Sequence, residues 1–337
     1  MTKTTALWIA LLAGATALQA QSGYKLIGSY PIPGTGTFDY VSIDSGARRL
    51  YVSHQTRLEV LDADSGKAVG FIPDTPGVHG ALIVPKFNHG FTTNGGEAKV
   101  TMFDTKTLKV IKKIDVGVRP DSFVYDAGSG RAFISNHGPT TITAIDPASG
   151  NVLGTLQVGG SAEQMVVGGD GLLYTSIQQL GEVLSFDPKT LQVKNHFPVA
   201  GCPHPSGLGV DTKYHRLFVG CGNQVLVVMD AQDGKVITSM PIGDKNDGVW
   251  FDPQGRLVFA STGEGKLNIF HQKSADRYED AGTVATEPNA KTSVFDAKTG
   301  KVYLIAADIE TIPAADPSQQ PTRKVKEGTF KVLVVGK

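Results

Sequence analysis

The hydrophobic and polar positions of the chain repeat with a period of roughly 42 residues. An apolar residue followed by Asp opens a turn at five places, and the intervals between these aspartates are 42, 42, 41 and 43 residues. The aspartates are Asp62, Asp104, Asp146, Asp187 and Asp230. At the next place, 41 residues further on, Phe270 is followed by His271 instead. Short β-branched runs between Gly, Pro and Asp turns at this period are typical of a β-propeller with one four-stranded sheet per blade.

Each repeat has the same internal order of strands and turns. Residues 126–130 (Asp-Ala-Gly-Ser-Gly) form a turn signal, and residues 131–135 (Arg-Ala-Phe-Ile-Ser) follow it as a strand. Alternating and β-branched residues between such turns are typical of β-hairpins. We expect the recurring aspartates to be structural, because an Asp at the start of a turn accepts hydrogen bonds from its own backbone.

The two ends of the chain each carry part of one blade. Residues 329–336 match the third strand of a repeat and no fourth strand follows them, whereas residues 24–32 match a fourth strand. We therefore expect the N-terminal strand to complete the last blade, which closes the ring and covers an exposed edge. The sequence predicts an all-β protein in which residues 24–337 form a single seven-bladed β-propeller domain with four antiparallel strands per blade.

Several segments of the repeat resemble the YVTN/YncE-like β-propeller family of exported bacterial proteins. They are residues 49–53 (Arg-Leu-Tyr-Val-Ser), 126–135 and 228–236 (Val-Met-Asp-Ala-Gln-Asp-Gly-Lys-Val). The resemblance covers the whole region after the N-terminal leader. It implies the fold and the compartment but little about activity, since many family members have no assigned reaction and one relative is linked to single-stranded DNA binding.

Residues 1–20 have the features of a secretory signal peptide. Lys3 supplies a positive charge, residues 6–17 are apolar, and small residues that suit processing lie at 15–17 and at 20. We therefore expect a periplasmic or secreted protein. No later segment reaches roughly 20 apolar residues, so we expect no membrane span.

The balance of charge disfavours nucleic acid as a partner. The chain has 32 Lys and Arg residues against 32 Asp and Glu residues. Binding of single-stranded DNA would require a basic face with exposed aromatic rings for stacking. DNA therefore remains only a second alternative for this neutral chain.

The two cysteines, Cys202 and Cys221, both lie in the fifth repeat. If residues 206–211 pair with residues 216–221, the two side chains meet at one end of the blade. In an oxidising compartment such a pair favours a structural disulfide over a redox or metal site.

One set of positions marks where the innermost strand of each blade begins, at the mouth of the central channel. Counting five residues back from the hairpin aspartate gives five of these positions, and the looser second and fourth repeats supply Gly80 and Glu163. The seven positions are Asp39, Gly80, Asp121, Glu163, Ser206, Asp247 and Lys291.

Four of the seven positions are acidic. Carboxylates that converge on a narrow pore repel one another and are costly to desolvate. Either water and neighbouring cations screen them, or some stay protonated, or a metal ion binds them. Hard oxygen ligands suit Ca²⁺ or Mg²⁺; the candidate ligands are Asp39, Asp121, Glu163 and Asp247. The alternative is a hydrated acidic channel with Lys291 as an internal counter-charge.

Two histidines lie next to these positions. His79 precedes Gly80, and His204 lies between two prolines two residues before Ser206. A histidine beside carboxylates is suited to act as a general base or a metal ligand. His204 is the candidate catalytic residue, and both histidines are candidates for ligand binding.

The last repeat carries a surplus of roughly 19 residues between its second and third strands, and loops of this length are often functional. We expect this segment, residues 307–328, to lie over the channel-mouth face, with basic side chains near the acidic ring; they are Arg323, Lys324 and Lys326.

The sequence carries no haem-attachment motif, paired-cysteine zinc motif, nucleophile elbow or phosphate-binding loop. The leading hypothesis is an exported propeller that binds a small molecule, a peptide or a protein partner on the channel-mouth face. The alternative is a divalent-metal-dependent hydrolase or lyase of the lactonase-like kind, with the acidic positions around the metal ion.

Overall fold

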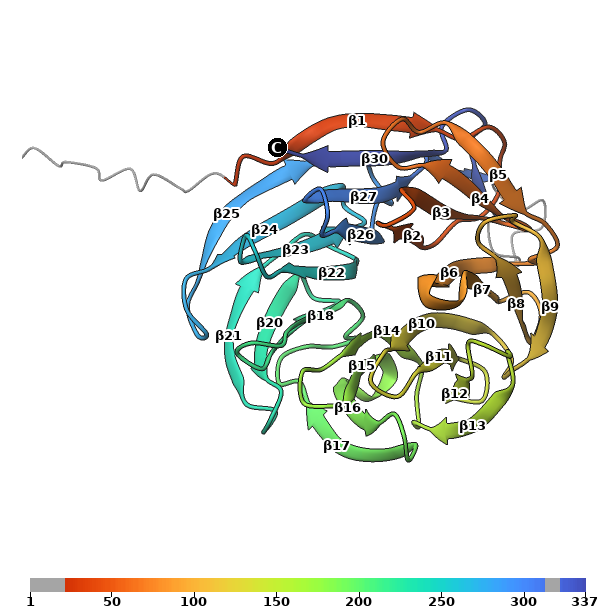
Figure 1. The fold of residues 1–337 in the computed structure, drawn as a ribbon. Helices are drawn as coiled ribbons and strands as arrows, with labels where there is room; N and C mark the ends of the chain where they lie inside the picture. Colours follow the sequence, from red (N-terminus) through yellow and green to blue (C-terminus); the bar gives the residue numbers. More distant parts are fainter. Residues whose placement is uncertain (1–21, 313–321) are drawn as a thin grey trace, which may run out of the picture.

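The computed structural model describes residues 22–312 and 322–337, so the expected signal peptide lies outside the described residues. The described chain forms seven four-stranded antiparallel sheets arranged as blades around a central axis (Figure 1). The predicted seven-bladed β-propeller is confirmed. The only helices among the described residues are two short 3₁₀ turns, η1 (Pro85–Phe87) and η2 (Gln178–Leu180), and neither is long enough to cross a membrane.

Each blade has four hydrogen-bonded strands, and its first-named strand lies innermost and its last-named strand outermost. Blade 1 contains β2 (Val41–Asp44), β3 (Arg49–His54), β4 (Arg57–Asp62) and β5 (Ala68–Ile72). Blade 2 contains β6 (Val78–Val84), β7 (His89–Asn94), β8 (Lys99–Asp104) and β9 (Val110–Asp115). Blade 3 contains β10 (Pro120–Asp126), β11 (Arg131–Asn136), β12 (Thr141–Ile145) and β13 (Val152–Gln157). Blade 4 contains β14 (Ala162–Val167), β15 (Leu173–Ile177), β16 (Glu182–Asp187) and β17 (Gln192–Pro198). Blade 5 contains β18 (Leu208–Asp211), β19 (Arg216–Gly220), β20 (Val225–Asp230) and β21 (Val236–Pro241). Blade 6 contains β22 (Asn246–Asp252), β23 (Leu257–Thr262), β24 (Lys266–Gln272) and β25 (Tyr278–Ala285). Blade 7 contains β26 (Ser293–Asp296), β27 (Lys301–Ala306), β30 (Lys331–Gly336) and β1 (Lys25–Pro31).

Blade 7 is built from both ends of the chain. β1 pairs antiparallel with β30, with Lys25 opposite Gly336 and Pro31 opposite Lys331. The C-terminus therefore lies beside the beginning of β1 (Figure 1). This pairing covers the edge of β30, whose backbone groups would otherwise be free to pair with another chain.

The hydrophobic core lies between neighbouring blades. The middle strands are buried on both faces: Leu50, Tyr51 and Val52 of β3 are fully buried. The turn aspartates hold the hairpins beside this core. Asp104 accepts hydrogen bonds from the backbone N–H groups of Lys106 and Thr107, at 3.0 and 2.7 Å. The same pattern recurs in the other repeats, as expected for a structural Asp.

The predicted disulfide between Cys202 and Cys221 is present, with a Cα–Cα distance of 5.1 Å. Both cysteines are buried, and they join the segment that enters blade 5 to the end of β19. The bridge thus anchors the loop that carries His204.

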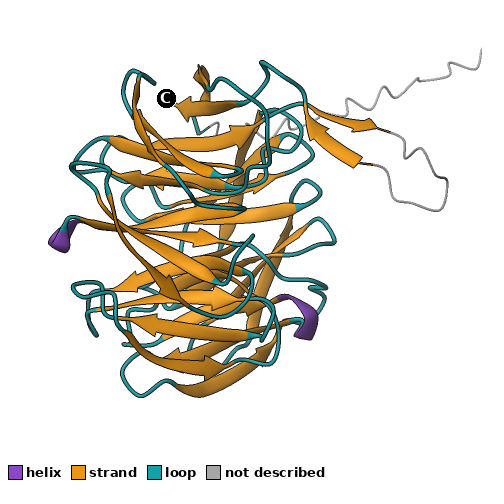
Figure 2. Ribbon diagram, turned by 90° about the vertical axis from the view of Figure 1, so that its right-hand side faces the viewer, coloured by secondary structure: helices purple, strands orange, loops and turns teal. Residues whose placement is uncertain are grey.

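The described residues of the segment between β27 and β30 include a two-stranded sheet. Its strands are β28 (Ile309–Ile312) and β29 (Thr322–Val325), and Ile309 is opposite Val325. The hairpin projects outward from the face on which the innermost strands begin (Figure 2). Lys324 and Lys326 are exposed and have no ion pair with the channel-mouth carboxylates within the described residues. The Arg323 side chain, which is also predicted to lie near the acidic ring, falls outside the described part of the structure.

Candidate functional site

The structure places the sequence-predicted positions at one end of the central channel. Each residue either precedes the innermost strand of its blade or is the second residue of that strand. The preceding residues are Asp39, Ser206 and Lys291, and the second residues are His79, Asp121, Glu163 and Asp247.

A break in strand pairing directs the four second residues toward the axis. The register between the first two strands shifts between Val78 and Gly80 in blade 2, so His79 stands outside the regular ladder. Equivalent shifts flank the other three residues. Such bulges re-aim a side chain. The channel position that the sequence assigned to Gly80 is therefore occupied by the imidazole of His79, and Gly80 lies behind that ring.

Gly80 is required for close packing. A Cβ atom there would come within 2.7 Å of the Phe123 ring and 2.8 Å of the Tyr40 Cβ. Tyr40 also donates its backbone N–H to the carbonyl of His79, at 2.8 Å. Blades 1 to 3 thus approach closely at the site.

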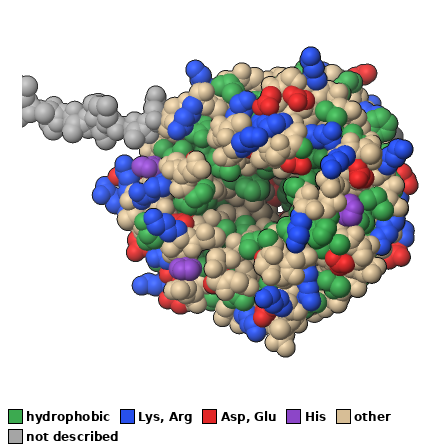
Figure 3. All heavy atoms as spheres, viewed as in Figure 1, with side chains coloured by type: hydrophobic (Ala, Val, Ile, Leu, Met, Phe, Trp, Pro, Cys, Tyr) green, Lys and Arg blue, Asp and Glu red, His purple; other side chains and the backbone are tan. Residues whose placement is uncertain are grey.

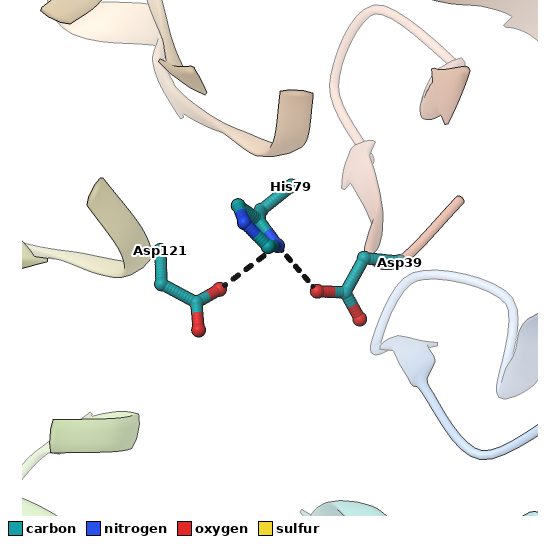
Figure 4. A group of neighbouring side chains, drawn as sticks. All are labelled: Asp39, His79 and Asp121. Carbon is teal, nitrogen blue, oxygen red and sulfur yellow. Dashed lines mark hydrogen bonds and ion pairs between the residues drawn. The ribbon is translucent and has the colours of Figure 1, made fainter. Parts of the chain in front are cut away.

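His79 lies between two carboxylates of neighbouring blades (Figure 4). Its Nδ1 atom is 2.7 Å from Asp39 Oδ2 and 3.5 Å from Asp121 Oδ1. Burial by itself lowers the pKa of His79, but the hydrogen bond to Asp39 and the charge of Asp121 raise that pKa overall. The imidazole therefore holds a proton between the two carboxylates more readily than a free histidine does.

His137 extends the cluster on the other side of Asp121. Its Nε2 atom is 3.2 Å from Asp121 Oδ2, 3.9 Å from Glu163 Oε1 and 3.1 Å from the carbonyl oxygen of Ala162. Burial lowers the pKa of His137, so its imidazole favours the neutral form. This residue follows β11, and counting first-strand positions missed it. Second strands end on the same face, so the same count applied to them would have found it.

Asp121 is the most constrained carboxylate of the cluster. Its Oδ1 atom is buried and has no hydrogen-bond partner within the described residues. Burial and the negative charge of Asp39 raise the pKa of Asp121 to about 7. Burial and the charge of Asp121 raise the pKa of Glu163 to about 8. Both groups retain protons near neutral pH because burial and the neighbouring carboxylates disfavour their ionised forms.

Asp247 belongs to a separate arrangement. Its Oδ2 atom forms an ion pair with Lys291 Nζ, and its Oδ1 atom accepts a hydrogen bond from the Ser206 hydroxyl. Burial alone lowers the pKa of Lys291, but Asp247 raises it above the ordinary value overall. Lys291 is therefore the predicted counter-charge: its ion pair is with Asp247, and its positive charge also acts on Asp121 and Glu163.

His204 is not brought to the cluster. It is exposed, adopts a positive φ of 52° and has no hydrogen bond or ion pair in the described part of the chain. The flanking prolines and the disulfide hold its loop at the rim of blade 5.

The channel beyond the cluster is apolar. A cavity of about 560 Å³ is lined by the innermost strands of all seven blades, including the aromatic residues Phe123, Tyr125, Trp250 and Phe251. Figure 3 shows the hollow from the face opposite the β28–β29 hairpin, with hydrophobic side chains around it. The acidic groups lie only at the rim, and the rest of the channel wall is mainly apolar. The expected hydrated acidic channel is therefore limited to the mouth.

Gln164 ties together the channel wall across blade 5. Its Oε1 atom accepts hydrogen bonds from the backbone N–H groups of Leu208 and Val249, at 3.0 and 3.1 Å. Its Nε2 atom donates to the carbonyl of Val249 at 3.1 Å. This side chain is therefore structural.

Comparison with known proteins supports the architecture. No family model matches the chain. The chain is 25% identical over 180 residues to the uncharacterized protein YncE of Salmonella typhi and to that of Salmonella typhimurium. The match covers 50% of this chain and 50% of each relative, so the chain spans about half the length of the curated relatives it matches. With the seven blades, this similarity supports a YncE-like propeller.

Proposed function

We propose that the protein is an exported propeller that binds a divalent transition-metal ion at the mouth of its channel and holds its ligand through that ion. The ligand atoms are the Asp39 carboxylate, Nδ1 of His79 and Oδ1 of Asp121. They come from three blades and lie within 4.8 Å of one another.

The observation that carries this proposal is the buried Oδ1 atom of Asp121. A buried carboxylate oxygen is usually hydrogen-bonded, because leaving it unpaired costs about 1–3 kcal/mol or more. This oxygen faces His79 and lacks a hydrogen bond within the described residues. A cation between these groups would supply the missing partner.

The donor set refines the identity of the ion. Ca²⁺ and Mg²⁺ prefer oxygen ligands alone, whereas imidazole nitrogen suits Zn²⁺, Fe²⁺ and similar ions. A site with one imidazole and two carboxylates therefore favours Mn²⁺, Fe²⁺ or Zn²⁺ over Ca²⁺.

Export is supported by the disulfide between Cys202 and Cys221. Disulfides persist mainly in oxidising compartments such as the periplasm. The N-terminal leader predicted from the sequence agrees with this assignment.

We assign binding rather than lactonase-like hydrolysis because His204, the catalytic residue predicted from the sequence, has no place in the cluster. His204 is exposed and has no hydrogen bond or ion pair in the described part of the chain. A metal ion alone would polarise a ligand oxygen.

Thermal melting after removal of metal tests the proposal. We expect Mn²⁺ or Zn²⁺ to raise the melting temperature of EDTA-treated protein, since an ion at about 100 times its Kd contributes about 2.7 kcal/mol to stability. Ca²⁺ should have a smaller effect. The variant His79→Ala should show a clearly smaller increase than the wild type.

The matched control is His196→Ala. His196 also pairs with a carboxylate, with Nδ1 2.7 Å from Glu182 Oε1, but it lies on the outermost strand of blade 4. This variant should keep the response to metal. Equal responses in His79→Ala and the wild type, or no response to any of these ions, would contradict the proposal.

A further inference from the structure

We propose that the channel mouth binds two divalent transition-metal ions bridged by the carboxylate of Asp121. This inference rests on the proposed metal-binding function and adds a second ion to the same site. The second set of ligands is Oδ2 of Asp121, Nε2 of His137 and Oε1 of Glu163.

The two sets share one residue and are otherwise separate. Asp39 and His79 lie on the Oδ1 side of Asp121, and His137 and Glu163 lie on its Oδ2 side. Within each set the ligand atoms lie within 4.8 Å of one another. A carboxylate whose two oxygens face two different imidazoles is arranged to bridge two cations.

The distances suit ligands of a common ion. Ligand atoms bound to a metal at about 2.1 Å lie about 3–4 Å from one another. Asp121 Oδ1 is 3.5 Å from His79 Nδ1, and Asp121 Oδ2 is 3.2 Å from His137 Nε2. Glu163 Oε1 is 3.9 Å from the same nitrogen. Only small side-chain movements are needed to admit an ion into each set.

The surroundings of His137 point to a cation independently of the first set. Oxygen atoms of Ala162, Asp121 and Glu163 all face its Nε2 atom, and Glu163 is 8% exposed. In the metal-free chain the His137 Nε2 atom is hydrogen-bonded to the Ala162 carbonyl, and the two neighbouring carboxyl groups have no cation between them in the described part of the chain. An ion in this position would bind the carboxylate oxygens together, with the nitrogen deprotonated.

The balance of charge favours two ions over one. Asp247 is neutralised by Lys291, and no Lys or Arg within the described residues forms an ion pair with Asp39, Asp121 or Glu163. Arg119 is exposed and acts on the two imidazoles only through its charge. One divalent ion leaves the three carboxylates with a net negative charge, whereas two ions and one bridging hydroxide neutralise them. Buried charge is tolerated when it is matched in this way.

The two sets differ in their access to solvent. The side chains of Asp39 and His79 are 20% and 35% exposed, whereas those of Asp121, His137 and Glu163 are about 10% exposed. The outer ion therefore carries the open coordination positions. Paired ions at about 3.5–4 Å bind oxyanions across both metals, so the class of ligand that fits is a small carboxylate or phosphate group.

Metal stoichiometry tests the inference. The full mature protein is stripped with EDTA, loaded with Mn²⁺, passed through a desalting column and assayed for bound metal. We expect two ions per chain in the wild type and one in each of the variants His79→Ala and His137→Ala. Glu163→Gln should weaken the inner site at least about tenfold, and His196→Ala should keep both ions.

The electron paramagnetic resonance spectrum of bound Mn²⁺ adds a readout that a structural role would not change. Two ions that share the Asp121 carboxylate couple magnetically, so the wild type should lose the resolved hyperfine lines of isolated Mn²⁺. His137→Ala should restore those lines. Melting curves in EDTA show whether each variant remains folded. If His137→Ala does not fold, Glu163→Gln takes its place as the test of the inner site.

The outcomes separate the two claims. One ion per chain that is lost in His79→Ala and retained in His137→Ala would overturn the paired site and leave the proposed function intact. No bound ion in the folded wild type would overturn both.

Discussion

Removing β1 is expected to turn a closed propeller into an aggregating protein. A deletion of residues 22–31 would expose the edge of β30, whose residues Val332 to Val335 are buried and apolar. It would also remove six paired positions between β1 and β30. At about 1 kcal/mol per backbone hydrogen bond, the loss amounts to several kcal/mol. Size-exclusion chromatography and thermal melting measure the result, and we expect a lower melting temperature by about 10 °C.

A circular permutant separates the two roles of β1. Gly23 lies beside Lys337, so a short linker from the C-terminus to residue 22 would keep β1 on β30, and new termini would open between β1 and blade 1. This variant should elute like the wild type and melt below it, because only non-covalent packing then closes the ring. A deletion variant with unchanged elution and unchanged melting would show that β1 does not protect the edge.

The metal-free protein is expected to lose stability as the pH rises from about 5 to 8. The pKa of Asp121 is raised from 3.8 to about 7, and that of Glu163 from 4.5 to about 8. Between the ordinary and raised values the folded chain binds protons that the unfolded chain has released. The stabilisation is therefore full below the ordinary pKa and is lost as the pH passes the raised pKa.

Asp121→Asn isolates the contribution of this carboxylate. A pKa difference of one between the folded and unfolded chain corresponds to about 1.4 kcal/mol. In EDTA at pH 8 the variant should therefore be more stable than the wild type, on the order of 2–4 kcal/mol. The gain should shrink as the pH falls and vanish below about pH 4, the ordinary pKa of Asp. Mn²⁺ should restore the wild type at pH 8 and have little effect on the variant.

Urea unfolding across this pH range, with and without EDTA, measures both effects. The matched control is Asp244→Asn. Asp244 lies outside the cluster on the same blade as Asp247, so this variant should show the same pH dependence of stability as the wild type. A pH dependence that is identical in the wild type and in Asp121→Asn would mean that Asp121 is ionised without cost in the folded chain.

The spacing of the repeats was sufficient to predict most of the fold. Because the hairpin aspartates recur at a nearly constant interval, counting back from them located Asp39, Asp121, Asp247 and Lys291 at one end of the channel. The incomplete end repeats likewise predicted that β1 pairs with β30. These features depend on strand period and strand order, which a single sequence displays.

The partners within the site could not be derived in the same way. A bulge between Val78 and Gly80 brings His79 into the position assigned to Gly80. Asp247 pairs with Lys291 instead of joining the cluster. His137, which follows the second strand of blade 3, lies beside Asp121. Such choices depend on local register and on the approach of neighbouring blades, neither of which the repeat period contains.

Anomalous X-ray diffraction from crystals soaked with Mn²⁺ is the most direct test of the account. We predict a seven-bladed ring with a strong peak among Asp39, His79 and Asp121. The absence of a peak at this position in crystals that bind Mn²⁺ elsewhere would contradict a metal site at the channel mouth.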